Sequence, residues 1–282
     1  MNKTDFVQLL DVSESEEHVF CSLLHRENFR RQLFGGQVLA QALSAAQKTV
    51  TDDRHIHSLH AYFLRAGTSS DVVNYQVECI RDGKSMSNRC VRAMQQGELI
   101  FTMHLSFHIK EPGYEHQQHI DLCTLPDPDQ LLAANPGLLN EPKDELLMPF
   151  VIVPVQEASL SSSDCHEAKA GFWIKTRDKL PLNSRLQASA LAFASDLGLL
   201  ATTLLPHPTS LFSGELAVAS VDHALWFHKA ELDLNQWHFC QMQSPWAGNA
   251  RGFATASIYD SSGNLVVNSA QEGLIRPNSL AS

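Results

Sequence analysis

One arrangement of predicted elements occurs twice along the chain: a helix built from small apolar residues, followed by four strand-like runs. The helices are predicted over residues 36–50 and 185–205. The apolar stripe of each helix has to be covered, and a meander of antiparallel strands covers it by wrapping around the helix. Solenoid repeats are far shorter than these halves, so the duplication indicates two tandem domains. The chain is therefore predicted to be an α+β protein.

Turn-forming residues separate the strand-like runs of each half. The runs cover residues 55–64, 72–80, 85–94 and 99–109 in the first half, and 216–227, 236–243, 250–259 and 265–275 in the second. Side chains also recur, since His60 matches His223 and Arg89 matches Arg251. Between the halves the chain is rich in proline and aspartate. We divide it into an N-terminal domain (1–115), a surface linker (116–149) and a C-terminal domain (150–282).

Two polar side chains occupy positions where the pattern calls for apolar ones. Asp196 interrupts the helix predicted at 185–205, and Gln271 stands among small residues in the last strand. The helical neighbours of Asp196 three and four positions away are apolar: Ala192, Phe193, Leu199 and Leu200. A buried carboxylate is costly unless it is paired or hydrogen-bonded, so a chain that retains one is expected to use it. The competing interpretation, an exposed helix edge, is disfavoured by those neighbours.

The motifs of several common chemistries are missing. The sequence has no GxSxG nucleophile elbow, no GxxxxGK[ST] loop and no GxGxxG turn, which disfavours serine hydrolases and the common nucleotide-binding folds. Histidines cluster at His55, His57 and His60 and again at His116 and His119, but no cysteine or carboxylate completes a zinc set. We therefore expect neither a metal nor a cofactor.

Composition indicates a globular protein that works outside the membrane. No apolar run approaches the roughly 20 residues that span a bilayer, and the N-terminus turns acidic where an export signal would continue apolar. The six cysteines are scattered without a CxxC pair, as expected for reduced thiols in the cytoplasm. A net charge of −10 disfavours a nucleic-acid partner. It does not exclude an anionic small molecule, which a local cluster of arginines can bind.

One such cluster lies in the run from Arg81 to Arg92, which also contains Lys84 and Arg89. These side chains are suited to binding phosphates. They are equally suited to the outward face of a hairpin that is charged for solubility. The sequence leaves both interpretations open.

Seven segments, in the same order, resemble the acyl-CoA thioesterase II family. They are FGGQVLAQAL (34–43), HSLHAYFLRAG (57–67), RDGKSMSNRCVRA (81–93), ASDL (194–197), VDHALWFH (221–228), ARGFA (250–254) and AQEGLIR (270–276). The resemblance covers nearly the whole chain. It implies two tandem hotdog domains, with antiparallel sheets each wrapped around a central helix. It also implies hydrolysis of medium- to long-chain fatty acyl-CoA to free fatty acid and CoA.

The resemblance further implies a catalytic set of Asp196, Ser220 and Gln271. The family has threonine or serine at the position of Ser220, and serine keeps the hydroxyl but loses the methyl that fixes its rotamer. Asp196 and Gln271 are also singled out by the residue pattern, whereas Ser220 rests on the resemblance alone. The implied chemistry is a water activated by Asp196 and held by the other two side chains, with backbone amides at a helix start polarising the carbonyl.

The repeat predicts one active site per chain. Counted from the shared Gly-x-Leu turn, the position matching Gln271 is Leu105 in the first half. The first helix carries no carboxylate, and its polar face holds Gln37, Gln41 and Lys48. We therefore expect a site built mainly from the second half, with walls from the first.

Two other functions remain as alternatives. A hotdog enoyl-CoA hydratase or dehydratase uses a histidine with a carboxylate, and Asp222-His223 is the pair that would supply it. A non-catalytic acyl-CoA-binding protein would tolerate loss of the Asp, Ser and Gln set, which is present here. As partners we expect an acyl-CoA substrate, no nucleic acid, no stable membrane insertion and a second copy of the chain. The exposed edges and flat faces of such sheets favour a homo-oligomer, either a dimer or a tetramer.

Overall fold

The structure, a computed structural model, describes residues 3–27, 32–139, 149–155, 163–211 and 213–278. The predicted helix and four strands of the first half are present and agree with the predicted bounds within a few residues. Its elements are α1 (Lys3–Leu10), β1 (Val12–Glu16), β2 (Val19–Ser22), α2 (Gly35–Gln47), β3 (His55–Phe63), β4 (Asn74–Asp82), β5 (Met86–Gln95) and β6 (Glu98–His108).

The second half repeats this arrangement after a connection that holds two short 3₁₀ turns and one helix. The connection contains η1 (Leu122–Thr124), α3 (Pro128–Ala134) and η2 (Pro136–Leu139). The elements that follow are β7 (Phe150–Pro154), β8 (Lys169–Thr176), α4 (Ser184–Ser195), α5 (Leu199–Thr202), β9 (Leu216–Ser220), β10 (Asp222–Phe227), β11 (His238–Gly248), β12 (Arg251–Asp260) and β13 (Leu265–Pro277).

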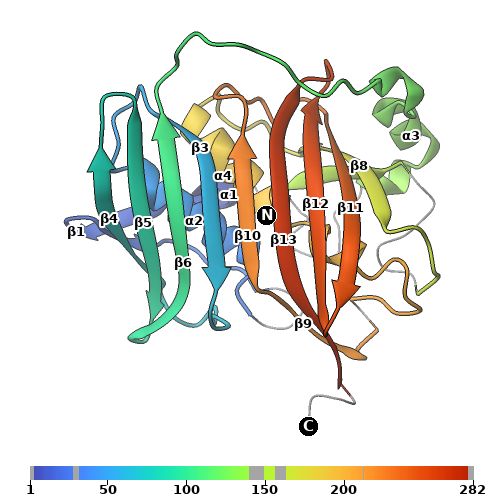
Figure 1. Ribbon diagram of the computed structural model, residues 1–282, viewed down its shortest axis with the longest axis horizontal. Helices are drawn as coiled ribbons and strands as arrows, with labels where there is room; N and C mark the ends of the chain where they lie inside the picture. The colour runs from blue at the N-terminus through green and yellow to red at the C-terminus, as the bar shows by residue number, and fades with distance from the viewer. Residues whose placement is uncertain (1–2, 28–31, 140–148, 156–162, 212, 279–282) are drawn as a thin grey trace.

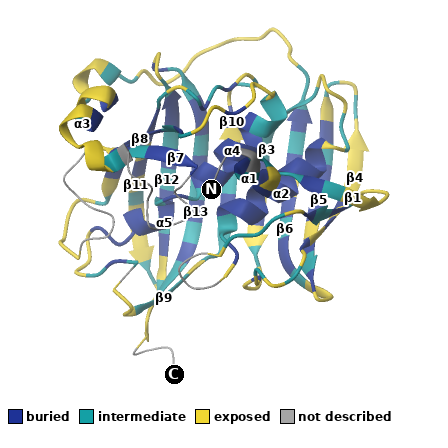
Figure 2. Cartoon of the chain, turned by 180° about the vertical axis from the view of Figure 1, so that it is seen from behind, coloured by how far each residue is buried: buried dark blue, intermediate teal, exposed yellow. Residues whose placement is uncertain are grey.

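The described strands of both halves form one antiparallel sheet. Its thirteen strands follow the order β1-β2-β4-β5-β6-β3-β10-β13-β12-β11-β8-β7, with β9 also paired to β13. The halves join where β3 pairs with β10, from Asp222 opposite Tyr62 to Trp226 opposite Ser58. Helices α1, α2 and α4 lie together on one face of this sheet, where the buried residues concentrate (Figures 1 and 2). The α+β prediction is confirmed.

Helices α2 and α4 pack against each other in the middle of this core. Small residues permit the close approach, because alanines on both helices are fully buried: Ala40, Ala42, Ala45, Ala46, Ala190 and Ala192. Of the three residues predicted on the polar face of α2, Lys48 is exposed, but Gln37 and Gln41 are both fully buried. Helix α1, which the sequence pattern did not predict, covers that side. Gln41 donates a hydrogen bond to Leu9 O of α1 at 2.8 Å and accepts one from Tyr75 at 2.7 Å.

The single helix predicted at 185–205 is wrong, because the chain breaks there into α4 and α5. Asp196 is the C-cap of α4, and Gly198 adopts a left-handed conformation with φ 79°. Glycine is favoured at such a helix end because it has no Cβ to clash. The break places the Asp196 side chain at the end of a helix instead of on its flank.

The strand predicted at 216–227 is likewise divided, into β9 and β10, with Val221 between them. The Val221 amide donates to Glu272 O at 2.9 Å, and its carbonyl accepts from the Phe63 amide at 3.0 Å. Both short strands pair with β13, β9 near its C-terminal end and β10 near its middle. Ser220, at the end of β9, therefore stands close to the centre of β13.

His60 and His223, which match in the repeat, do not occupy equivalent positions in the sheet. His223 pairs with Ala61, and His60 pairs with Ala224. Because successive strand residues point to opposite faces, the two histidines lie on opposite sides of the sheet. His223 is buried under the helices, whereas His60 is exposed with its ring edge-on to Trp226. A bulge in β3 between Ile56 and Ser58 shifts its register with β6, while the pairing of β3 with β10 runs without a shift.

Arg89 and Arg251 also differ in environment. The Arg89 side chain is 2% exposed and donates to Thr49 Oγ1 at 2.8 Å and to Asp82 Oδ1 at 2.9 Å. Arg251 is exposed and forms a salt bridge with Glu272 at 3.2 Å. Arg89 is therefore committed to holding its hairpin against α2, and the phosphate-binding interpretation does not apply to it.

The segment predicted as a surface linker packs on the second half over its described residues, with 140–148 lying outside the description. Leu132 of α3 is buried in a second apolar cluster with Trp173, Phe239 and Tyr259. This cluster lies on the sheet face opposite α4, and Figure 1 shows α3 at that end of the sheet. None of the helices in the described ranges is long and apolar enough to cross a membrane. The domain limits at 115 and 149 stay a proposal.

Candidate active site

Asp196, Ser220 and Gln271 form one hydrogen-bonded group. The side-chain amide of Gln271 in β13 donates to Asp196 Oδ1 at 2.6 Å and to Ser220 Oγ at 3.0 Å. The three residues come from the end of α4, the end of β9 and the middle of β13, which the helix break and the division of the strand bring together. Each predicted site residue therefore lies within hydrogen-bonding distance of another.

The second carboxylate oxygen of Asp196 is bound by the first half of the chain. The backbone amide of Gly36, in the first turn of α2, donates to Asp196 Oδ2 at 2.8 Å. A helix N-terminus favours a negative charge because its amides and its dipole both point toward it. Nothing in the periodicity of the sequence predicts this contact. The available signal was the Gly35-Gly36 pair at the predicted start of the helix.

Both glycines are required by the close approach of α2 to the end of α4. A Cβ on Gly35 would stand 2.7 Å from Asp196 Oδ2, and a Cβ on Gly36 would stand 2.4 Å from the Phe193 carbonyl oxygen. Neither distance is a possible contact: a side chain at position 36 would push the two helices apart, and one at position 35 would displace the Asp196 carboxylate.

Burial decides the protonation behaviour of Asp196. Its side chain is 6% exposed. Burial raises the pKa of Asp196 to about 6, against the lowering effect of the hydrogen bonds from Gln271 and Gly36. A carboxylate that titrates near neutral pH is a better proton acceptor than an exposed one, because its pKa lies closer to the working pH. Asp196 is thus suited to general-base chemistry.

Gln271 has one unused hydrogen-bonding atom. Its side chain is buried, and within the described residues Oε1 has no hydrogen-bond partner. A buried acceptor without a donor costs free energy, and such atoms are expected to meet a water or a ligand. Oε1 therefore marks a place in the site where an O–H group would be stabilised.

The Asp222-His223 dyad of the alternative function is contradicted by the geometry. Adjacent residues of β10 point to opposite faces, so the two side chains cannot form a pair. Asp222 Oδ1 accepts the Glu272 amide at 2.7 Å. The His223 ring instead lies beside Asp196, with Nδ1 at 3.9 Å from Oδ1. Burial lowers the pKa of His223 to about 3, so the ring is neutral.

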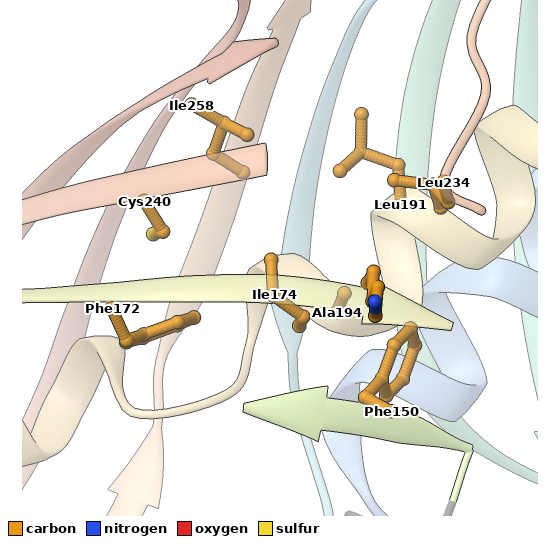
Figure 3. A pocket seen from close by; sticks show the side chains of 9 residues that line it. Phe150, Phe172, Ile174, Leu191, Ala194, Leu234, Cys240 and Ile258 are labelled. Atoms are coloured by element: carbon orange, nitrogen blue, oxygen red, sulfur yellow. The ribbon is translucent and has the colours of Figure 1, made fainter. Parts of the chain in front are cut away.

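An apolar cavity lies beside the last turns of α4 (Figure 3). It has a volume of about 10 Å³ and is lined by side chains that include Phe150, Leu191, Ala194 and Cys240. A cavity of this size holds about one water-sized sphere.

Burial raises the pKa of the Cys240 thiol to about 12, which rules it out as a thiolate nucleophile near neutral pH. Among the described residues, no group of three or more His, Cys, Asp or Glu side chains is arranged to hold a metal ion.

The sequence matches models of a known protein family in both halves. The model described as the acyl-CoA thioesterase N-terminal domain matches residues 25–108, and that of the acyl-CoA thioesterase C-terminal domain matches residues 128–275. Acyl-CoA thioesterase 2 of Haemophilus influenzae is 35% identical over 279 residues, covering 96% of this chain and 97% of that protein. Acyl-coenzyme A thioesterase 8 of Homo sapiens is 36% identical over 262 residues, covering 87% of this chain and 81% of that protein.

Solved structures show the same fold. The acyl-CoA thioesterase II TesB2 of Mycobacterium marinum superposes with a TM-score of 0.81 at 32% identity, covering 97% of this chain and 99% of that one. A protein of Alicyclobacillus acidocaldarius described as having a hot dog fold superposes with a TM-score of 0.77 at 14% identity, covering 96% and 97%. The double hotdog architecture expected from the sequence is confirmed.

Proposed function

The chain belongs to the acyl-CoA thioesterase family and hydrolyses acyl-CoA thioesters, and from this premise we propose that Asp196, Ser220 and Gln271 activate the attacking water. The observation that carries the proposal is the buried, hydrogen-bonded group that these side chains form at the end of α4. Asp196 accepts a proton from the water as the water oxygen attacks the thioester carbon.

Gln271 organises the group. Its amide nitrogen binds both Asp196 and Ser220, which fixes the distance between the base and the hydroxyl. Its free Oε1 accepts the second O–H of the water, so the water is oriented before it reacts. The Ser220 hydroxyl keeps its own hydrogen, because Oγ acts as acceptor toward Gln271, and it donates to the bound water. Together the three side chains present a single water to one face of the thioester.

The start of α2 stabilises the negative charge that develops on the carbonyl oxygen. The Gly36 amide of this first turn already binds Asp196, so the helix dipole and the preceding amide, that of Gly35, are the groups we expect to serve the carbonyl oxygen. The tetrahedral intermediate then collapses, the carbon–sulfur bond breaks, and the electron pair leaves with sulfur. The CoA thiolate is a good leaving group and takes up a proton, so no dedicated acid is required.

Purified protein is expected to release free CoA from acyl-CoA without added metal or cofactor. A thiol-release assay over acyl lengths from C2 to C18 measures this and identifies the preferred length. We propose medium- to long-chain substrates, as the family resemblance implies. A chelator should leave the rate unchanged, and complete inhibition by it would contradict the metal-free mechanism. Conversion of enoyl-CoA to hydroxyacyl-CoA without thiol release would identify the hydratase alternative instead.

Ser220 is expected to act through its hydroxyl. Ser220→Thr keeps the hydroxyl and should stay active, whereas Ser220→Ala should lose up to about tenfold in kcat, the value of one hydrogen bond. KM should change little, because the hydroxyl holds the water and not the substrate. Steady-state kinetics of the two variants test this. Equal rates for Ser220→Ala and the parent protein would remove Ser220 from the proposed set.

We also propose that the chain forms a homo-oligomer through the sheet face opposite α2 and α4. Tyr62 and Trp226 are 57% and 38% exposed on this face, next to the exposed His60. Aromatic side chains that remain exposed on a flat sheet are typical of contact surfaces. Light scattering distinguishes a monomer from the dimer or tetramer.

We also propose that the protein is located in the cytoplasm. Its six cysteines are all free, as expected for a protein kept in a reducing compartment.

A further inference from the structure

His223 of β10 lies directly beside Asp196 and takes no part in the proposed chemistry. Its side chain is fully buried on the helix side of the sheet. Nε2 is 2.9 Å from Ser195 Oγ, and Nδ1 is 3.9 Å from Asp196 Oδ1. Within the described part of the chain Nδ1 has no hydrogen-bond partner. A buried ring nitrogen that faces a carboxylate without bonding to it calls for an explanation.

We assign the imidazole proton of His223 from the contacts of the neighbouring serine. The Ser195 hydroxyl has one hydrogen, and it is donated to the Ala192 carbonyl oxygen at 2.8 Å. Ser195 Oγ is therefore an acceptor toward His223, and the imidazole proton is on Nε2. The ring is neutral, because burial lowers the pKa of His223 to about 3. Nδ1 accordingly presents a lone pair toward Asp196.

We propose that His223 is a positioning residue that strengthens Asp196 as a base, because its Nδ1 lone pair disfavours the carboxylate and accepts a hydrogen bond from the protonated carboxyl. The inference rests on the proposed function. In the step it assists, the water proton moves to Asp196 Oδ1, and that O–H then points at Nδ1. The ring receives no proton. A shift of about 1 Å brings the two atoms to hydrogen-bonding distance.

The other described groups that face Asp196 act in the opposite direction. The Gly36 amide from α2 and the Gln271 amide from β13 both donate hydrogen bonds, which stabilise the carboxylate. The charged neighbours in sequence, Asp222 and Glu272, alternate to the other face of their strands, where Glu272 pairs with Arg251. His223 is thus the residue in this set that favours the protonated form.

The pH profile of kcat separates this role from a merely structural one. His223→Gln keeps an amide N–H for Ser195 but removes the lone pair that faces Asp196. We expect the acidic limb of the profile to move to lower pH by up to about one unit. We also expect the plateau kcat to fall about two- to tenfold because the base is weaker, with KM unchanged. The matched control is His60→Gln, an exposed histidine on the adjacent strand, which should leave both the limb and the plateau in place.

Ser195→Ala provides a second variant. Without its acceptor on Ser195, the His223 proton is better placed on Nδ1, where it donates to Asp196 and stabilises the carboxylate. This variant should therefore also move the acidic limb to lower pH.

Long-range ¹H–¹⁵N NMR of the parent protein reports the tautomer independently of folding of any variant. A proton on Nδ1, an unmoved limb in folded His223→Gln, or a limb displaced to higher pH would overturn the proposal. An acidic limb that persists in Asp196→Asn would instead refute Asp196 as the base, which distinguishes failure of the two proposals.

Discussion

Asp196→Asn is expected to lower kcat by about 10²–10⁴-fold, because it removes the proton acceptor while keeping the shape of the side chain. The parent protein should also lose activity as the pH falls through about 6, where Asp196 becomes protonated. The variant has no such group, so any residual rate should be flat across that range. Thiol release measured from pH 4.5 to 8.5 tests both statements on the same two proteins.

The same substitution is expected to leave the melting temperature unchanged or to raise it at neutral pH. The pKa of Asp196 is higher in the folded protein, about 6, than its ordinary value of 3.8. The carboxyl thus contributes stability that is fully present below about pH 3.8 and is lost as the pH rises through about 6. A pKa difference of about two units means that ionisation of Asp196 lowers the free energy of unfolding by about 3 kcal/mol. Asparagine does not ionise, so the variant avoids this loss. The asparagine side chain also fits the site. Its oxygen can accept from the Gly36 amide, and its nitrogen can donate to Gln271 Oε1 once the Gln271 side-chain amide has rotated by half a turn.

The outcome that would contradict the mechanism is an active but destabilised Asp196→Asn. A structural carboxylate paired with a buried arginine would behave in that way, since its removal leaves an unpaired charge. The described partners of Asp196 are the Gly36 and Gln271 amides instead. Measuring kcat and melting temperature on one preparation separates the two cases.

Gly36→Ala is expected to damage stability and activity together. Alanine normally stabilises a helix relative to glycine, but here its Cβ would stand 2.4 Å from the Phe193 carbonyl oxygen of α4. Backbone cannot yield as a flexible side chain does, so α2 and α4 must separate at a cost of about 1–3 kcal/mol. The Gly36 amide then moves away from Asp196, and kcat should fall at least about tenfold, since displacements of about 1 Å cost up to about 100-fold.

Gly35→Ala should affect activity more than stability, because its Cβ meets the end of a side chain, Asp196 Oδ2, at 2.7 Å. Gly113→Ala is the control, since nothing lies within 4 Å of a Cβ at that position. Thermal unfolding and kcat of the three variants can be compared directly. If Gly36→Ala matched Gly113→Ala in both measurements, the contact between the start of α2 and the end of α4 would not matter to the enzyme.

Features of the fold that depend on nearby residues were predictable from the sequence. The two helices, most strands and the polar positions Asp196 and Gln271 followed from local periodicity, because a polar group inside an apolar run is visible without knowing the fold. The breaks at Gly198 and Val221 were missed, since the apolar pattern continues across both. Ser220 carries no signal of its own, because its role depends on a partner in another strand.

Features that depend on distant parts of the chain were not predictable. The Gly36 amide and Asp196 are 160 positions apart, and no periodicity relates them. The pattern places Gln41 on the polar face of its helix, and it cannot show that α1 covers that side chain. The match of His60 with His223 did not predict their positions, because the two side chains point to opposite faces of the sheet. The tautomer of His223 depends in turn on Ser195, a residue whose hydroxyl looks unremarkable in sequence.

The C-cap positions of the two central helices show what joining the halves in one chain permits. Lys48 ends α2, and Asp196 ends α4. In a symmetric pair of identical chains, every substitution occurs in both copies. The single central helix of such a chain would then need both a first turn that binds a carboxylate and a last residue that supplies one. Here the two halves vary separately. The first half supplies the amide that binds the proposed base, and the second half supplies the base itself. The equivalent helix end in the first half bears Lys48, which forms a salt bridge with Asp11 instead.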